Sequence, residues 1–364
     1  MDNTEEIVNS IKVSLEKMEN KEFSIYFFVM DTKGAPVGSV ANIYEHVKML
    51  NDLGYNAKIL HEKTEYANQQ VDYIKNWLGE EYGNLPHVSI EDQTVKINGA
   101  DFIVVPELFA NVMEQTSKLP GKRIVLCQAY DYITETLQPG KTWRDYGITD
   151  CITTTEQQKE YVQNLFNNGI NVDVIPVGVG DEFKKPNKPK KPIVSIYTRD
   201  QRDTVKLFKT FYLKYPHLKW ITFRDMRGMD KKTFGKALEE SCVSVWIDDI
   251  AGFGTFPIES MKCGTPVIGK IPNLMNGWIN EKNGVWVDNN NVIPEILSQY
   301  LQSWLEDNEP KELFEKMDET VDNYTLEKQK EAVESVYTKL FQNRIEEFKT
   351  TLEKYEVNNV EENK

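Results

Sequence analysis

Short, uninterrupted apolar runs alternate with helix-like segments along most of this chain. The first set of runs lies at 23–30, 57–60, 101–105, 123–127, 150–153 and 172–175, and a second set lies at 193–196, 220–223, 243–247 and 266–268. Between the first two runs Val40, Ile43, Val47 and Leu50 recur at the three- and four-residue spacing of a helix. Unbroken apolar strands are typical of parallel sheets that are covered on both faces. The pattern therefore predicts an α/β fold with doubly wound parallel sheets.

A lysine- and proline-rich segment divides the alternation into two halves. Residues 184–192 read KKPNKPKKP, with five lysines and three prolines, which is incompatible with a core segment and typical of a linker. We expect one domain at 1–183 and a second at 193–324, with a helix at 325–355 packing back on the first and disorder after Tyr355. Two such halves would place a ligand in the cleft between them.

The charge of the chain is strongly uneven. The 364 residues carry a formal net charge of -14, yet residues 184–236 contain 16 Lys or Arg against four Asp, so this block is basic and the remainder strongly acidic. A basic block of this kind often faces phosphate. The apolar runs are far shorter than the roughly 20 residues that span a bilayer, and the acidic start does not read as a signal peptide. We therefore expect a cytoplasmic protein.

Metal or disulfide chemistry is not indicated by the cysteines. Cys127, Cys151, Cys242 and Cys263 are widely spaced, and no CxxC pair occurs. We expect buried free thiols, no bound metal and no cofactor.

The segment 246–268 has the strongest chemical pattern. A strand ends in Asp248 and Asp249, a loop containing Gly252 and Gly254 follows, and the next helix would begin near Pro257. Such a loop lets a phosphate approach backbone N–H groups at the positive end of a helix. Glu259 lies in the first turns of that helix, where its carboxylate can accept hydrogen bonds from vicinal hydroxyls such as those of a ribose. A tight turn before a helix would have the same glycines. The glycine pattern alone is therefore compatible with a phosphate-binding loop and with an ordinary turn.

This segment resembles the nucleotide-sugar site of retaining GT-B glycosyltransferases of the family-4 type, whose pattern is E-x7-E around a GFG core. The match includes Gly252-Phe253-Gly254, Glu259 and the run CGTPVI at 263–268. Further similarity lies at 174–179 with Phe183, and at Asn283-Gly284. The resemblance covers most of 23–300 and implies a GT-B fold of two Rossmann-like domains. It also implies that the donor, a nucleotide-diphosphate sugar, is bound by Gly252, Phe253, Gly254, Thr255, Phe256 and Glu259.

One position departs from the family pattern. The first glutamate of E-x7-E, which in the family holds hydroxyls of the transferred sugar, falls at Ala251. Only the second, ribose-binding glutamate carries over, as Glu259. Asp248 and Asp249 lie just upstream, and we hypothesise that Asp249 takes over part of the donor contact. Capping of the loop is the alternative role for both aspartates.

The family also places an Arg, and a Lys five residues later, against the donor diphosphate. Arg199 follows the first strand of the second half, but Thr204 stands where the lysine would be. Arg202 and Lys206 flank it. We expect Arg199, with Arg202 or Lys206, to bind the diphosphate, since a guanidinium fork meets two phosphate oxygens. A solvated helix face is the alternative for each.

Candidates in the first half lie after strand-like runs. Gly34 and Gly38 belong to the first strand–helix loop, which in the resembled fold lies near the donor phosphates. Glu107 and the pair Tyr130-Asp131 follow two later strands and are candidates for the acceptor side. Capping or ordinary turn geometry is the alternative for each.

We therefore expect a hexosyl- or pentosyltransferase that needs no metal and transfers its sugar with retention, with Arg199, Lys206 and Glu259 as the central residues. Two alternatives stay open. One is the same chemistry on a hydroxymethylated DNA base, for which the basic block would contact DNA. The other is a nucleotide-sugar-binding partner subunit without turnover, because Ala251 replaces the sugar-holding carboxylate.

Overall fold

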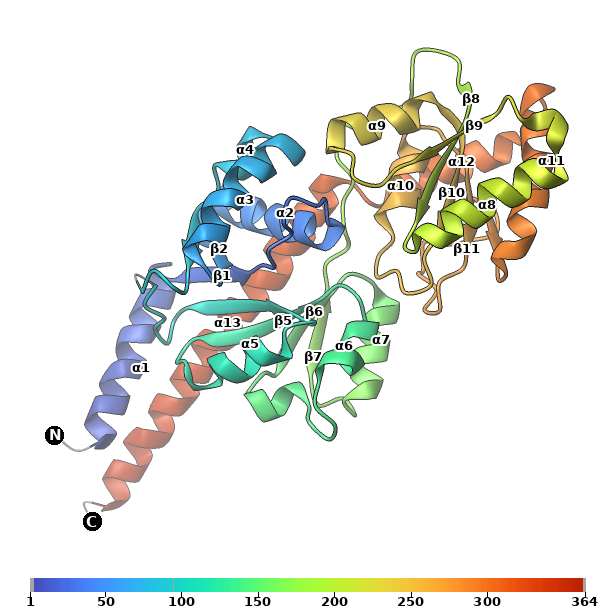
Figure 1. Ribbon diagram of the computed structural model, residues 1–364. Helices are drawn as coiled ribbons and strands as arrows, with labels where there is room; N and C mark the ends of the chain where they lie inside the picture. Colours follow the sequence, from blue (N-terminus) through green and yellow to red (C-terminus); the bar gives the residue numbers. More distant parts are fainter. Residues whose placement is uncertain (1–2, 94, 363–364) are drawn as a thin grey trace.

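The computed structural model describes residues 3–93 and 95–362, which form two α/β domains, each with its own parallel sheet (Figure 1). The first sheet has the order β3-β2-β1-β4-β5-β6-β7. Its strands are β1 (Ser24–Phe28), β2 (Asn56–His61), β3 (His87–Ser89), β4 (Phe102–Pro106), β5 (Lys122–Cys127), β6 (Asp150–Thr153) and β7 (Asn171–Val174). All neighbouring strands in it run parallel, so the helices that connect them cover the two faces.

Helix α1 precedes the first strand, and the other helices of the first domain lie between successive strands. The helices of this domain are α1 (Asn3–Glu19), α2 (Gly38–Asp52), α3 (Thr64–Trp77), α4 (Glu80–Gly83), α5 (Ala110–Gln115), α6 (Asp131–Thr136) and α7 (Glu156–Leu165). The loops that precede α2 and α6 both follow strands, so both helices begin at the carboxyl edge of the sheet. That edge faces the second domain.

The second domain has a smaller sheet with the order β12-β11-β10-β8-β9. Its strands are β8 (Lys191–Thr198), β9 (Thr222–Asp225), β10 (Ser241–Ile247), β11 (Val267–Lys270) and β12 (Val285–Val287). Its helices are α8 (Gln201–Lys214), α9 (Lys231–Glu240), α10 (Thr255–Lys262), α11 (Ile293–Leu305) and α12 (Lys311–Val321). The fully buried pattern of β10 reflects its central place in the sheet.

The chain crosses between the domains twice, at adjacent points. The backbone N–H of Val179 donates to the carbonyl of Tyr324 at 2.8 Å, so the outgoing and returning segments lie side by side. A Cβ on Gly178 would lie 2.5 Å from the carbonyl oxygen of Thr325. Such a close approach requires glycine at this crossing.

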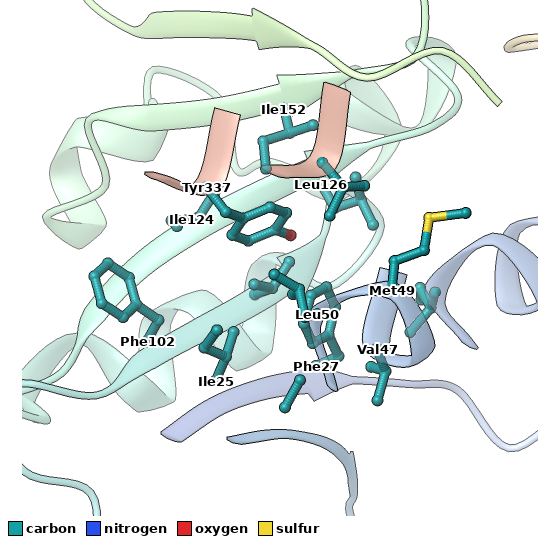
Figure 2. Packing of buried hydrophobic residues seen from close by; sticks show 14 of the residues in the cluster. Ile25, Phe27, Val47, Met49, Leu50, Phe102, Ile124, Leu126, Ile152 and Tyr337 are labelled. Carbon is teal, nitrogen blue, oxygen red and sulfur yellow. The ribbon is translucent and has the colours of Figure 1, made fainter. Parts of the chain in front are cut away.

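After the second crossing the chain forms α13 (Leu326–Glu362), which runs along the first domain and reaches α1. Figure 2 shows Tyr337 of α13 pointing into the core of the first domain, close to Ile124, Leu126 and Ile152 of its sheet. The Tyr337 side chain is fully buried. Burial of this kind stabilises by roughly 1.5–3 kcal/mol per large apolar side chain, which fixes α13 to the first domain.

Most elements lie where the sequence predicts them, with local differences. Strand β8 starts at Lys191, inside the segment expected as a linker, and β9 starts at Thr222 rather than at 220. Helix α13 continues to Glu362, so the expectation of disorder after Tyr355 is wrong for the backbone. The four cysteines are free and buried.

Candidate functional site

The glycine loop between β10 and α10 forms the centre of the candidate site. Gly254 has a positive φ of 76° and occupies the N-cap position of α10, and no side chain caps this helix. Two side chains hold the loop in place. The carbonyl of Phe253 accepts hydrogen bonds from Asn276 Nδ2 at 2.9 Å and from Trp278 Nε1 at 2.8 Å. The first N–H groups of α10 therefore have no side-chain partner and are suited to an anion.

The aromatic residues of this loop face the protein interior. The Phe253 and Phe256 side chains are buried in the core of the second domain, and Phe256 stacks on Tyr197 with ring centroids 5.4 Å apart. Only backbone atoms of these residues remain for a donor. Thr255 is partly exposed at the first position of the helix.

Gly252 contacts the first domain. A Cβ built on it would lie 1.6 Å from the carbonyl oxygen of Gln128, which follows β5. A further contact joins the same surfaces, because the Gly277 N–H donates to Gln157 Oε1 at 3.0 Å. The glycine loop thus forms part of the interface between the domains.

Arg199 lies at the carboxyl end of β8, but an aspartate already engages it. Its Nε and Nη2 donate to the two carboxylate oxygens of Asp248, at 2.7 and 3.1 Å. Its Nη1 donates to the Tyr132 hydroxyl across the cleft at 3.2 Å. The Arg199 side chain is 43% exposed whereas that of Asp248 is 9% exposed, so one edge of the guanidinium stays accessible to a ligand.

The second aspartate is also paired. Asp249 forms an ion pair with Lys270, which ends β11. Asp248 and Asp249 therefore each bind a cation in this structure, and neither is a free carboxylate in place of the missing glutamate at 251. Ala251 itself is buried in the apolar core.

The other two expected phosphate ligands, Arg202 and Lys206, have partners of their own. Arg202 pairs with Asp200 and its side chain is 90% exposed. Lys206 donates to Asn291 Oδ1 at 2.9 Å, just before α11. Thr204, at the family's lysine position, is buried and hydrogen-bonded to Thr198. Arg202 and Lys206 are thus each engaged by partners other than those of Arg199.

Glu259 lies one turn into α10 and is partly buried. Burial raises its pKa to about 8, Lys231 opposes this rise, and the negative charge of Glu182 adds to it. Lys231 is the first residue of α9, and its ammonium pairs with two carboxylates, Glu45 of the first domain and Glu182 of the segment that crosses between the domains. With its pKa raised to this value the Glu259 side chain titrates near neutral pH, and its carboxyl oxygens can accept hydrogen bonds from hydroxyl groups.

The first domain contributes an uncapped helix opposite this loop. Gly38 begins α2, and its N-cap residue Val37 makes no side-chain capping bond. Gly34 has a positive φ of 80° in the preceding turn, and both glycines are exposed. The loop therefore presents free backbone N–H groups at the carboxyl edge of the sheet.

Glu107 differs from its expected role as an acceptor contact. It is only 2% exposed, and its two carboxylate oxygens accept the backbone N–H groups of Gln128 at 3.1 Å and Ala129 at 2.8 Å. Burial raises its pKa to about 7, against these hydrogen bonds. Glu107 therefore positions the loop that contacts Gly252.

Tyr130 and Asp131 lie in the interface itself. Tyr130 is buried against Tyr161, with ring centroids 4.9 Å apart. Asp131 is partly exposed, and its pKa is raised by burial and by Glu135 while Arg199 opposes the rise. Asp131 thus lies within the electrostatic field of Arg199.

Sequence reasoning missed Tyr132, Gln128, Lys231 and Lys270. Tyr132 directly follows the candidate Asp131, Gln128 directly follows the predicted strand 123–127, and Lys270 lies two residues after the predicted strand 266–268. Their positions at or near the ends of predicted strands could have identified these three residues as candidates. Lys231 had none, since its partners lie far away in sequence.

About half of the basic block is neutralised locally. Arg224 and Lys191 pair with Glu240, Arg227 with Asp225, and Lys185 with Asp318. Lys190 is partly buried and donates to the carbonyl of Cys263 at 2.7 Å. The block is therefore not one continuous open cationic face.

Two absences concern the described residues only. No helix in 3–93 or 95–362 is long and apolar enough to cross a membrane. Within that same part of the chain, no group of three or more His, Cys, Asp or Glu side chains is arranged to hold a metal ion.

Comparison with known proteins identifies the fold class. No protein-family model matches the sequence, and no curated protein matches it. Solved structures do match over nearly the whole chain. The pneumococcal O-GlcNAc transferase GtfA, in complex with UDP and GlcNAc, gives a TM-score of 0.65 at 11% identity and covers 89% of this chain and 99% of that one.

Two further solved structures agree. A variant of S. aureus TarM, in complex with fondaparinux, alpha-GlcNAc-glycerol and UDP, gives a TM-score of 0.62 at 12% identity, covering 87% of this chain and 99% of that one. Sucrose-phosphate synthase from Thermosynechococcus elongatus gives a TM-score of 0.60 at 14% identity, covering 88% of this chain and 99% of that one. These structural neighbours are GT-B glycosyltransferases. The chain therefore has the GT-B fold, in which two Rossmann-like domains face each other across a cleft.

Proposed function

We propose that this chain is a glycosyltransferase that takes a nucleoside-diphosphate sugar as donor and glycosylates an acceptor hydroxyl with retention. The observation that carries the proposal is the Gly252–Gly254 loop. It leads into an uncapped α10 with Glu259 one turn further on. It is also joined to the uncapped start of α2 through Gln128, whose backbone carbonyl lies against Gly252 and whose side chain donates to the Ser39 carbonyl. Two of the structural neighbours hold UDP, which makes uridine the first base to test.

In the proposed complex the second domain binds most of the donor. Glu259 accepts the ribose hydroxyls, and the α10 N-terminus with the free edge of Arg199 holds the diphosphate. Negative charge grows on the leaving diphosphate in the transition state, where these fixed positive groups stabilise it. We propose that they serve in place of a bound metal.

The acceptor hydroxyl attacks from the face that the diphosphate leaves. A bond forms between the acceptor oxygen and the anomeric carbon, the bond from that carbon to the phosphate oxygen breaks, and the acceptor proton passes to the departing phosphate. The configuration is thereby retained, and no side-chain base is needed. Asp131 and Tyr132, across the cleft from Arg199, border the acceptor side in this proposal.

Binding and turnover test the proposal directly. A thermal-shift panel of UDP, GDP, ADP and dTDP with their hexose and pentose derivatives identifies the donor, because a bound ligand raises the melting temperature by mass action. Release of nucleoside diphosphate with candidate acceptors then measures transfer, and the anomeric coupling in the product's NMR spectrum reports retention. A Glu259→Ala variant with full affinity and activity would refute the site.

A second candidate function is supported by the paired aspartates. Because Arg199 and Lys270 are bound to Asp248 and Asp249, and Ala251 offers no carboxylate, the chain suits a partner subunit that binds a sugar nucleotide without turnover. Tight donor binding with no release of nucleoside diphosphate would favour this function. Release that depends on acceptor would exclude it.

The acceptor class is tested separately. A hydroxymethylated DNA base predicts retardation of duplex DNA in a gel, with affinity falling steeply as salt rises. The exposed cations Lys209, Lys214 and Lys219 would be its first contacts. Glycan and other small acceptors predict no such retardation.

The cytoplasmic location expected from the sequence is a further prediction.

A further inference from the structure

Helix α8 has an exposed side that combines cations with large apolar side chains. Its buried side is formed by Thr204, Leu207 and Phe211, at the three- and four-residue spacing of a helix. The opposite side is exposed and carries Arg202, Val205, Lys206, Lys209 and Leu213. The exposed residues at the end of the helix are Lys214, Lys219 and Trp220, and we call the whole set the α8 face. Figure 1 shows α8 on the outside of the second domain.

The apolar side chains of the α8 face are unusually open to solvent. Leu213 is 83% exposed, the highest fraction among the large apolar side chains that the structure describes. Trp220 is 50% exposed and Val205 is 37% exposed. The Tyr212 hydroxyl donates to the Ile221 carbonyl at 2.6 Å, which holds the segment containing Trp220 against the end of α8. Leu213 and Trp220 therefore lie at the same end of the helix, where exposed apolar groups of this size are typical of an interaction site.

The cations of the α8 face lack acidic partners close by. Residues 201–220 contain five Lys or Arg and a single acid, Asp203. Lys209, Lys214 and Lys219 are exposed, and none of them forms an ion pair with any residue that the structure describes. Part of the basic block that the local ion pairs leave unmatched thus gathers on α8 and the segment after it.

The neighbouring helix limits the α8 face on one side. Helix α11 packs against α8, and Glu295 in its first turn and Glu306 directly after its last residue are both exposed. The cationic surface therefore does not continue over α11. Along α8 it extends for about 20 Å, since the helix has 14 residues and each adds about 1.5 Å.

Two properties of the α8 face indicate the chemistry of its partner. The lysines require negative charge, and Leu213 and Trp220 require an apolar environment. Nucleic acid offers the charge, but its backbone is contacted mainly by cationic and polar groups, which leaves an aliphatic side chain such as Leu213 without a partner. An anionic lipid surface offers both, because lysines bind its headgroups while Leu and Trp side chains enter the boundary with the acyl chains.

We propose that the α8 face binds the surface of an anionic membrane. Lys209, Lys214 and Lys219 lie in the headgroup layer, and Leu213 and Trp220 insert just below it. The chain as a whole has a formal net charge of -14, so such a membrane repels most of its surface and the protein docks in one orientation. The association is peripheral, and it does not depend on the transfer reaction proposed above.

Flotation of the full chain with lipid vesicles tests this proposal. Binding is measured to vesicles of phosphatidylcholine alone and of phosphatidylcholine with about 30 mol% phosphatidylglycerol, over a series of salt concentrations. We expect binding to the anionic vesicles only, and we expect it to weaken as salt screens the lysines. Equal binding to both kinds of vesicle, or no binding to either at low salt, would overturn the proposal.

Two sets of variants separate charge from insertion. Lys209→Gln/Lys214→Gln/Lys219→Gln should lower the partition coefficient for anionic vesicles by about 100-fold, since each lysine near such a surface contributes about fivefold. Leu213→Ser/Trp220→Ser keeps every charge and should lower it by about 10-fold, because the inserted apolar area is lost. Wild-type binding in either variant would refute the arrangement.

Matched controls change the same residue types elsewhere on the surface. Lys12→Gln/Lys141→Gln/Lys311→Gln removes three other exposed lysines, and Val13→Ser/Ile90→Ser removes two apolar side chains that are 52% and 48% exposed. Both controls should bind anionic vesicles within about threefold of the wild type, because these positions lie outside the α8 face. Circular dichroism and the melting temperature verify that each variant is folded.

A duplex DNA gel shift with the same variants distinguishes the two polyanionic partners. Should the chain bind DNA but no vesicles, and should Leu213→Ser/Trp220→Ser retain full DNA binding, the lysines serve a nucleic acid and the membrane proposal is overturned. Vesicle binding is measured without any sugar nucleotide. A chain that binds anionic vesicles through the α8 face but binds no nucleoside diphosphate would therefore support this inference and refute the proposed function.

Discussion

Gly252 of the second domain lies against the backbone carbonyl of Gln128 in the first, so closely that a Cβ at position 252 would come within 1.6 Å of that oxygen. The Gln128 carbonyl is held in place, because the Glu107 carboxylate accepts hydrogen bonds from the backbone N–H groups of Gln128 and Ala129. The contact joins the loop proposed to bind donor phosphate to the domain proposed to bind acceptor. Glycine at 252 is thus a condition for the two domains to meet as they do.

A Gly252→Ala variant should hold the domains apart. The methyl group cannot occupy the space beside the Gln128 carbonyl, so we expect a larger radius of gyration in small-angle X-ray scattering with a melting temperature little changed. Misplacement of reacting groups by about 1 Å lowers rates by roughly 100-fold, and we expect a loss of that order in transfer. Gly38→Ala, where a Cβ meets open space, is the control for domain arrangement. An unchanged scattering curve in Gly252→Ala would contradict this account.

The ion pair between Arg199 and Asp248 should contribute more to the free energy of unfolding than an ordinary surface ion pair does. Removing the guanidinium leaves the Asp248 carboxylate, only 9% exposed, without its two hydrogen bonds. We expect Arg199→Met to lower the free energy of unfolding by about 2 kcal/mol in urea titrations. The double variant Arg199→Met/Asp248→Asn should regain part of this loss. Equal losses in the single and double variants would show that the pair does not contribute.

Arg202 provides the matched comparison. It pairs with Asp200, but its side chain is 90% exposed, so water competes fully for the contact. Arg202→Met should change the free energy of unfolding by less than about 0.5 kcal/mol. A loss as large as that of Arg199→Met would mean that burial does not set the difference.

Glu107 should make stability depend on pH. Its folded-state pKa of about 7 lies above the ordinary value of 4.5, so the folded chain binds the proton more tightly than the unfolded chain. The stabilisation is therefore full below about pH 4.5 and is lost as pH rises through 7, by roughly 2–3 kcal/mol. Urea unfolding of the wild type relative to Glu107→Gln, at pH 5, 6, 7 and 8, measures this change. A difference between the two that is constant with pH would contradict it.

The fold could be predicted largely because apolar strands and helical spacing are local signals. Helix α3 was missed because its buried face includes Ala67 and Gln70 as well as Ile74 and Trp77, which weakens the apolar periodicity. Strand β3 is a three-residue edge strand, too short to give a pattern.

The site could be predicted less completely, because its chemistry depends on partners that are distant in sequence. The position of Arg199 at a strand end was visible in the sequence. Its neutralisation by Asp248 and its contact with Tyr132 were not, since they arise only when three strand ends and both domains come together. Lys231 and Glu45 likewise meet only across the domain interface. Local pattern therefore locates the candidate residues, and the packing of the two sheets decides which charges remain free.

Asp249 and Lys270 should affect the sugar and the diphosphate differently. If Asp249 contacts the donor sugar, Asp249→Asn should weaken binding of the sugar nucleotide by about 10-fold and leave the affinity for the free nucleoside diphosphate unchanged. Lys270→Met should weaken both ligands, because it removes a positive charge beside the proposed diphosphate site and leaves Asp249 without its cation. Calorimetry with both ligands measures these affinities. An equal loss for both ligands in Asp249→Asn would show that this aspartate serves only to hold Lys270, and the sugar would then be bound by other groups in the loop.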